Sequence, residues 1–165
     1  PTQSSSIINE TYNFKTSKLV SDGNSIFISN NKNEFYSIDV KTGTTNWISD
    51  IKSNITPVIT GNLIFTVSNE GYLYAIEKNK GNIIRVTDLF KIYKQKKRKN
   101  IYPIGFVIGN KNLYLTNSDG KMIVVDLQNG SIIKTEKVSS NLVSKPFIFN
   151  NNLFLIRNGS IIQYN

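Results

Sequence analysis

The sequence contains no cysteine and no histidine in its 165 residues. Their absence excludes disulfide bonds, thiolate nucleophiles, Ser-His-Asp triads and the usual zinc ligands. No apolar stretch approaches the roughly 20 residues that a membrane-spanning helix needs, and no signal peptide opens the sequence. The hydrophobic content of 39% and the charged content of 19% are nevertheless those of a globular protein. A chain of this length and composition can bury a sizeable core.

Positive charge is concentrated in one short segment. The net charge is +9, but six basic residues fall within nine positions that contain no acid, and the rest of the chain carries only +3. The six residues are Lys91, Lys94, Lys96, Lys97, Arg98 and Lys99. Nucleic-acid binding requires aromatic residues interleaved with a basic surface, and only Tyr93 and Tyr102 flank this run, so we expect no nucleic-acid partner. We interpret the run first as a solvated loop; the alternative is a candidate loop that attracts an acidic protein or acidic lipid headgroups.

One sequence pattern recurs three times, at offsets of 38 and 49 residues. In each copy an apolar strand ends in an acidic residue, and a glycine follows that acid four positions later. The three pairs are Asp39 and Gly43, Glu77 and Gly81, and Asp126 and Gly130. Self-similarity at this period is typical of stacked repeat units, none of which buries its apolar face alone.

Two tight turns are predicted in each repeat. Asn33, Gly71 and Gly120 stand at the same position of the first turn, and a position with positive φ accepts glycine freely and asparagine next best. The glycine after the acid is expected to be the left-handed residue of a second turn that contains a bulge. The acid itself is expected to accept backbone N–H bonds inside that turn. We therefore interpret these repeat residues as structural.

Each repeat is predicted to form four antiparallel strands with negligible helix, because its apolar residues alternate or run continuously. The expected segments are blades at about 17–50, 55–90 and 103–138, a partial blade at 145–165, and a D strand at 6–11. The fold class is therefore an all-β propeller of four-stranded antiparallel blades, with about four blade equivalents, interpreted as half of an eight-bladed ring. The first turns of the repeats should share one face with the basic run. We expect the rest of the propeller or a second copy of the chain to cover the open ends.

With the repeats aligned, residues 37–47 resemble the pyrroloquinoline-quinone-like (PQQ-like) propeller repeat, whose form is small–apolar–Asp–x–x–Thr–Gly–x–x–x–Trp. The other two copies keep the acid and the glycine but carry Arg85 and Lys134 in place of the tryptophan. In that family the tryptophan packs between neighbouring blades. The resemblance therefore implies that Trp47 is buried between two blades. We expect the charged ends of Arg85 and Lys134 to reach solvent while their stems cover apolar surface.

The order of features is similar to the C-terminal half of the family of the outer-membrane assembly factor BamB. The likeness lies in residues 56–67, in the long insertion before residues 102–105, and in the closing blade at 145–164. It implies a non-catalytic scaffold without a cofactor that mediates protein-protein interactions in outer-membrane β-barrel assembly. The implied partners are BamA-like periplasmic domains and unfolded outer-membrane proteins. The implied location is the periplasm, peripheral to the outer membrane, as a lipoprotein whose anchor belongs to an N-terminal part preceding this sequence.

A fragment of a PQQ-type quinoprotein dehydrogenase is the alternative, because such enzymes share the repeat. They use a calcium-held quinone, a catalytic aspartate and usually a vicinal cysteine pair with a stacking tryptophan. Here there is no cysteine, and the one tryptophan is Trp47 of the repeat. The three acids already have structural explanations, so we expect no enzyme, no cofactor and no metal. Another periplasmic propeller that acts as a binding module also remains open.

Overall fold

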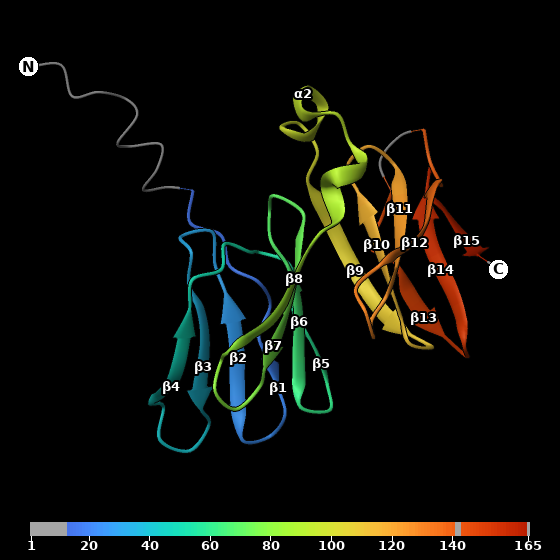
Figure 1. Cartoon of the computed structure of the whole chain (residues 1–165). Helices are drawn as coiled ribbons and strands as arrows, with labels where there is room; N and C mark the ends of the chain where they lie inside the picture. The colour runs from blue at the N-terminus through green and yellow to red at the C-terminus, as the bar shows by residue number, and fades with distance from the viewer. Residues whose placement is uncertain (1–12, 141–142, 165) are drawn as a thin grey trace, which may run out of the picture.

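The computed structural model of the protein describes residues 13–140 and 143–164. In this part of the chain the strands form four consecutive antiparallel sheets, shown in Figure 1. Within each sheet, every strand pairs with the next strand in sequence, so each sheet is a meander. This arrangement confirms the predicted all-β propeller fold with four-stranded antiparallel blades. The strand expected at 6–11 lies outside the described residues.

We call the four sheets blades 1 to 4, in chain order. Blade 1 contains β1 (Val20–Ser21), β2 (Ser25–Ser29), β3 (Phe35–Asp39) and β4 (Thr45–Ser49). Blade 2 contains β5 (Val58–Thr60), β6 (Leu63–Val67), β7 (Tyr72–Glu77) and β8 (Ile83–Asp88). Blade 3 contains β9 (Pro103–Gly109), β10 (Asn112–Asn117), β11 (Lys121–Asp126) and β12 (Ile132–Lys137). In its described part blade 4 contains β13 (Phe147–Phe149), β14 (Asn152–Arg157) and β15 (Ser160–Tyr164).

The hydrophobic core lies between the blades, because successive residues of a strand point to opposite faces of its sheet. We call the face toward the preceding blade the front face and the other the back face. On the back face of blade 1, Phe27 and Phe35 pack with Ile64 and Ile76 on the front face of blade 2. Similar clusters join blades 2 and 3 and blades 3 and 4. Each described interface is therefore built from the back face of one blade and the front face of the next.

The turns have the predicted geometry. At the first turn of the repeat, Asn33, Gly71 and Gly120 have φ values of 66°, 87° and 75°. These values confirm that asparagine in blade 1 adopts the left-handed conformation that glycine adopts in blades 2 and 3. At the second turn, the glycines that follow the acids have φ values of 71°, 73° and 79°. The register shifts between the two strands joined by this turn in each of the three blades, as the predicted bulge requires.

Two short helical turns lie in the connection between blades 2 and 3. The 3₁₀-helix η1 (Leu89–Ile92) follows β8, and the one-turn helix α2 (Gln95–Arg98) follows η1. The sequence patterns predicted neither of them, because four residues are too few to show a helical period. They do not change the all-β class. Among the described residues, no helix has both the length and the apolar character needed to cross a membrane.

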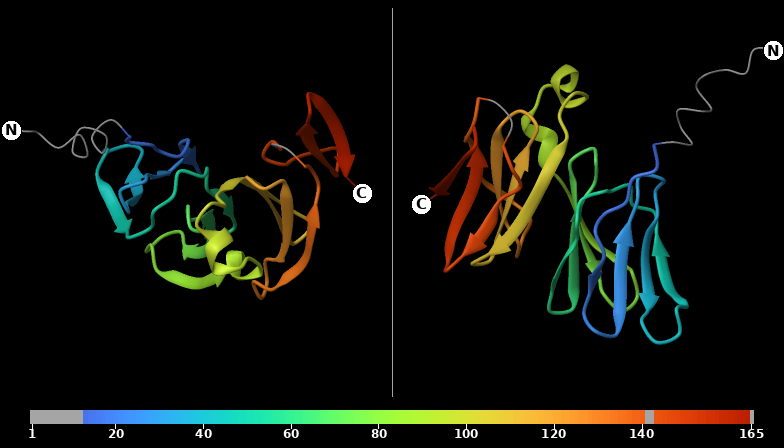
Figure 2. Two further views of the ribbon diagram at one scale, coloured as in Figure 1. Left: turned by 90° about the horizontal axis from the view of Figure 1, so that it is seen from above. Right: turned by 180° about the vertical axis from the view of Figure 1, so that it is seen from behind.

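The blades follow one another around an open arc, with blade 1 at one end and blade 4 at the other (Figure 2). The turns that join β2 to β3, β6 to β7 and β10 to β11 all lie at the same end of the blades as α2 (Figure 1). We call this end the loop face. The prediction that these turns share one face with the basic run is therefore confirmed.

Candidate functional site

The acids of the repeat hold the second turn of their own blade. Asp39 accepts backbone N–H bonds from Lys41 and Thr42 at 2.9 and 2.8 Å. Hydrogen bonds from Thr42 lower the pKa of Asp39. Asp126 accepts the corresponding bonds from Gln128 and Asn129, at 2.7 and 3.1 Å. These contacts agree with a structural role for the two aspartates.

Glu77 uses its longer side chain differently. Its carboxylate accepts a hydrogen bond from the Asn82 side chain at 2.9 Å and lies 4.0 Å from the Lys80 ammonium. No backbone N–H bond to this carboxylate is found among the described residues, so the predicted bonding within the turn is wrong for blade 2. The turn nevertheless keeps its geometry, because the backbone bond from Gly81 N–H to the Glu77 carbonyl is present at 2.9 Å.

Trp47 docks blade 1 onto the second turn of blade 2. It is 9% exposed, and its ring lies so close to Gly81 that a Cβ atom at that position would overlap the indole. The indole Nε1 donates a hydrogen bond to the carbonyl of Lys78, at 2.9 Å. The ring also contacts Phe27 and Phe35, with centroids 6.0 and 5.6 Å away. The residue is therefore buried between two blades, as the resemblance implied.

Arg85 makes the equivalent contact between blades 2 and 3: the side chain is partly exposed, but its charged end also bonds to the next blade, which the prediction of a solvent-facing end did not include. Its guanidinium donates to the carbonyls of Leu127 and Gln128, at 2.6 and 2.7 Å. The side chain lies over Gly130, where a Cβ atom would overlap it. Leu127 directly follows the acid of blade 3, just as Lys78 follows the acid of blade 2. Arginine therefore replaces the indole as the hydrogen-bond donor to the next blade.

Lys134 behaves as predicted. Its side chain is 57% exposed, and its ammonium pairs with Glu136 at 2.6 Å. It also lies 5.7 Å from the centroid of the Tyr164 ring on blade 4. The hydrogen bond to Glu136 raises the pKa of Lys134, so the side chain stays charged.

The basic run is attached to the propeller by buried aromatic residues. Leu89 and Phe90 are fully buried, and Asp88 caps η1 by accepting the Phe90 N–H at 3.0 Å. The Phe90 ring occupies the space where Gly71 has no side chain, in the turn between β6 and β7. The Phe90 ring meets the Tyr93 ring edge to face at 5.4 Å. The apolar residues that anchor this segment, Leu89 and Phe90, directly precede the basic residues in the sequence.

Two of the six basic residues fasten the segment to the loop face. Arg98 donates to Asp88 at 2.7 Å and its guanidinium lies 5.1 Å from the centroid of the Tyr72 ring. Lys97 lies 3.3 Å from the carboxylate of Asp119 in the turn between β10 and β11.

Tyr93 completes this second attachment. Its hydroxyl donates to Asp119 at 2.9 Å and accepts from the Asn117 side chain at 3.2 Å. Burial raises the pKa of the Tyr93 phenol. The ammonium groups of Lys97 and Lys121 lie 5.6 and 4.8 Å from the centroid of the ring. These contacts tie the basic run to blade 3 as well as to blade 2.

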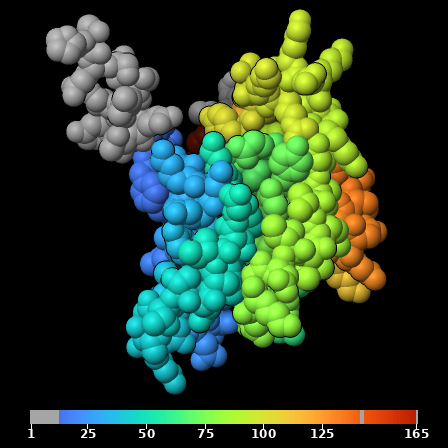
Figure 3. All heavy atoms as spheres, turned by 60° about the vertical axis from the view of Figure 1, so that its left-hand side comes forward, coloured from blue at the N-terminus to red at the C-terminus, as the bar shows by residue number. Residues whose placement is uncertain are grey.

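The other four basic residues project into solvent. In the part of the chain that the structure describes, none of them has an ion pair or a side-chain hydrogen bond, and all are exposed. They are Lys91, Lys94, Lys96 and Lys99. The segment stands at the top of the molecule in the view of Figure 3. The basic run is therefore a fixed pedestal with four free ammonium groups, which sequence alone could not separate from the two that are paired.

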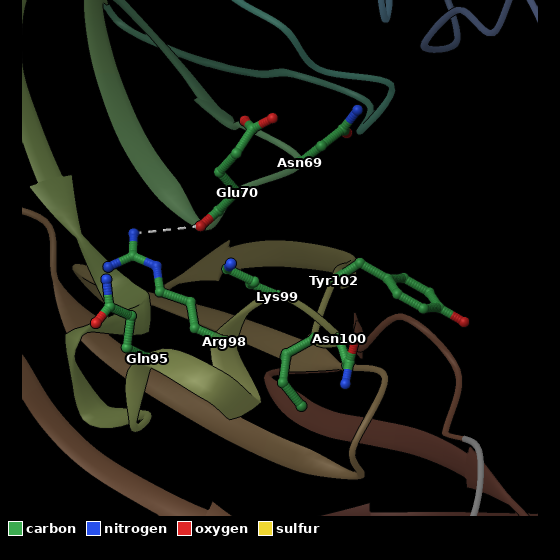
Figure 4. A pocket seen from close by; sticks show the side chains of 8 residues that line it. Asn69, Glu70, Gln95, Arg98, Lys99, Asn100 and Tyr102 are labelled. Atoms are coloured by element: carbon green, nitrogen blue, oxygen red, sulfur yellow. Dashed lines mark hydrogen bonds between the residues drawn. The ribbon is translucent and has the colours of Figure 1, made fainter.

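Two adjoining hollows lie beside this pedestal on the loop face. The first, of about 590 Å³, separates it from the turn between β6 and β7 (Figure 4). The second, of about 550 Å³, extends to Asn31 in blade 1. Asn69 and Tyr102 line both, so the hollows form one trough. Its amide and charged lining residues are Asn13, Lys15, Asn31, Lys52, Asn54, Asn69, Glu70, Gln95, Arg98, Lys99 and Asn100.

The trough is suited to binding a polar chain. Asparagine side chains both donate and accept, so they match the alternating groups of an extended peptide backbone. Lysine supplies positive charge, whereas Glu70 is the single acid in the lining. Within residues 13–140 and 143–164 no group of three acidic side chains is placed to hold a metal ion. The chemistry that the loop face offers is recognition of acidic and backbone groups.

Comparison with known protein families shows to which family the chain belongs. The profile of the family described as "Outer membrane protein assembly factor BamB" matches residues 2–87, which is just over half of the chain. The chain belongs to the BamB family. The resemblance predicted from the repeats is thereby confirmed. A search of curated proteins found no match.

Solved structures similar to this chain include a member of the BamB family. The crystal structure of BamB from Moraxella catarrhalis superposes with a TM-score of 0.71 at 15% identity, over 89% of this chain and 41% of that one. This chain therefore spans about two fifths of that BamB. The computationally designed protein Ika4 superposes with a TM-score of 0.69 at 11% identity, over 90% of this chain and 89% of Ika4. At these identities the likeness is one of fold.

Proposed function

We propose that this chain is a non-catalytic propeller scaffold that holds protein partners during assembly of outer-membrane β-barrel proteins, in the periplasm. Membership of the BamB family supports this role. The observation that carries it is the loop face, where a rigid pedestal and a polar trough lie side by side. Each is fixed by side chains from two blades. A binding surface held in this way loses little conformational entropy when a partner docks.

The partners proposed are BamA-like periplasmic domains and segments of unfolded outer-membrane proteins. An acidic segment in extended conformation matches the trough, because lysines surround amide groups that can pair with its backbone. Lysine is a compact point charge on a flexible stem, which tolerates partners of varied geometry better than a bidentate arginine does. Arg85 and Arg98, whose guanidinium groups bond with fixed geometry, make their contacts within the fold instead.

The experiment compares two triple variants in binding to the purified periplasmic domains of a BamA-type insertase. The first variant changes Lys94, Lys96 and Lys99 to glutamate on the pedestal. The matched control changes Lys41, Lys80 and Lys111 to glutamate, which are exposed at the end of the blades opposite the loop face. Both variants change the net charge by the same amount. Only the loop-face variant should weaken binding, by roughly tenfold or more, which is about 1.4 kcal/mol.

Two further observations define the outcome. The difference between the two variants should shrink in high salt, because exposed charges are screened beyond about 10 Å at 0.1 M salt. Equal weakening by both triple variants would mean that net charge alone attracts the partner. Unchanged binding by the loop-face variant would remove this face from the binding site.

A further inference from the structure

A third hollow lies where the first strands of all four blades begin. It measures about 520 Å³, and residues from each of the four blades line it. Because the blades of a propeller surround a central channel, the meeting of four first strands places this hollow at that channel. We call it the channel pocket. It shares Asn54, Ile55 and Ile104 with the second hollow of the trough, so the trough opens directly into it.

One repeated position of the fold supplies a residue to the pocket from every blade. In each blade one residue of the first strand pairs with an aromatic residue of the second strand. The equivalent residues two places before that pair are Lys18, Thr56, Gly105 and Lys145. All four line the channel pocket. The pocket is thus formed on the inner edge of the described blades, whatever covers the outer faces of blades 1 and 4.

Gly105 makes room for Lys145 in this pocket. A Cβ atom on Gly105 would lie 2.7 Å from the Cβ atom of Lys145 and 3.6 Å from its Cδ atom. Gly105 is not among the glycines with positive φ, so its backbone does not require glycine. What glycine supplies here is the missing side chain, and the stem of Lys145 lies against the backbone of blade 3 in its place.

The pocket carries positive charge without a compensating acid. Lys18 and Lys145 are both exposed, and within residues 13–140 and 143–164 neither ammonium has an ion pair. No acidic residue of that part of the chain lines the pocket. The Thr56 hydroxyl and the Asn54 amide add hydrogen-bond donors.

Apolar side chains line the same pocket. Ile55 and Phe106 are at most 9% exposed, and Val58 lies beside them in the lining. Binding pockets commonly combine such apolar walls with a few polar groups that fix the orientation of a ligand. The pocket therefore suits an anionic group that has an apolar neighbour.

Continuity with the trough indicates which anion this is. The anionic groups of an unmodified peptide are carboxylates, and a peptide that lies in the trough reaches the pocket past Asn54 and Ile55. We propose that the channel pocket binds a carboxylate of the segment held in the trough, with Lys18 and Lys145 as its cationic partners. The peptide nature of the occupant rests on the proposed function, whereas the preference of the pocket for a carboxylate does not.

The test uses small probes that do not need the trough. N-acetylvaline has a carboxylate beside an apolar side chain, and N-acetylvalinamide is its uncharged counterpart. In NMR titrations of the chain at constant ionic strength, N-acetylvaline should bind about fivefold tighter or more, because hydrogen bonds to charged groups are stronger. The backbone amide signals of Thr56 and Gly105 should shift, and that of Lys41 should not. N-acetylaspartic acid α-amide then separates a side-chain carboxylate from that of a chain end.

Three variants locate the preference for the carboxylate. Lys18→Met together with Lys145→Met removes both ammonium groups but keeps apolar stems, and should abolish the preference. The matched control, Lys41→Met together with Lys80→Met, changes the net charge equally at the opposite end of the blades and should keep it. Gly105→Ala alters no charge but displaces Lys145, so it should reduce the preference. Circular dichroism checks that each variant is folded.

The outcomes separate this proposal from the proposed function. Equal binding of N-acetylvaline and its amide would overturn the carboxylate site. A preference that survives in the Lys18 and Lys145 variant, or that falls equally in the control, would also overturn it. The pedestal variant with glutamate at Lys94, Lys96 and Lys99 should keep the preference even if it no longer binds the insertase domains. The two proposals can therefore fail independently.

Discussion

Truncating Trp47 to alanine removes one of the main contacts that join blades 1 and 2. The indole contacts Phe27 and Phe35, covers Gly81 and donates to the Lys78 carbonyl. Removal of a buried aromatic side chain costs about 3–5 kcal/mol in free energy of unfolding. With a urea m-value of about 2 kcal/mol/M, the midpoint of urea unfolding should fall by about 2 M.

The assay follows far-UV circular dichroism, because Trp47 is the only tryptophan and the variant has no indole fluorescence. All chains are compared at one concentration, since association adds to apparent stability. Trp47→Phe keeps an aromatic ring but loses the hydrogen bond, so it should cost only about 1–2 kcal/mol. Tyr102→Ala truncates a ring that is 54% exposed and should change little. A Trp47→Ala midpoint equal to that of Tyr102→Ala would refute the docking role.

Three further substitutions test neighbouring contacts. Gly81→Ala should lower the free energy of unfolding by at least about 2 kcal/mol more than Gly43→Ala does. Both glycines have φ near +70°, but only Gly81 lies beneath the indole. Equal losses of stability in urea unfolding would contradict this. Arg85→Ala should cost about 1–2 kcal/mol, since two carbonyls lose a charged donor, and Arg85→Lys should recover part of that loss. The hydrogen bond to Lys78 lowers the pKa of Asp22 from 3.8 to about 2. The stability advantage of Asp22 over Asp22→Asn should therefore be complete above about pH 4 and disappear as the pH falls toward 2; a pH-independent difference in thermal unfolding would exclude the ion pair as its cause.

The fold could be predicted from sequence because the same turn residues recur in three repeats. Asn33, Gly71 and Gly120 specify a left-handed turn residue, and their positive φ values bear this out. Three copies of one turn also fix the spacing of the strands around it. Trp47 could be placed between blades because its position in the repeat matched a known motif. These patterns lie within short segments, so they can be recognised in a single sequence.

The loop face could not be predicted in the same way, because its organisation depends on contacts between distant residues. The basic run looked like one charged loop, but Asp88 and Asp119 divide it into two fastening residues and four exposed lysines. Asp119 lies more than 20 positions from Lys97, and nothing in their spacing indicates a contact. The signal that was overlooked is the pair Leu89 and Phe90, since two large apolar residues before a charged run indicate that the run is anchored.

Arg85 shows why a residue substitution in a repeat must be interpreted through its partner. The predicted solvent exposure followed from the properties of arginine alone. In the next blade, however, the backbone carbonyl of the residue after the repeat acid is available as an acceptor. A side chain that lies over the turn glycine and donates a hydrogen bond to this carbonyl can therefore join the two blades. Trp47 and Arg85 both satisfy that condition, one with an indole N–H and one with a guanidinium. The receptor for docking is thus the turn, which Asp126 and Gly130 shape in blade 3 and which the backbone bond from Gly81 N–H to the Glu77 carbonyl holds in blade 2. Glycine stands in both docked turns where the docking side chain lies directly over it, whereas the docking residue need only be a donor of sufficient length.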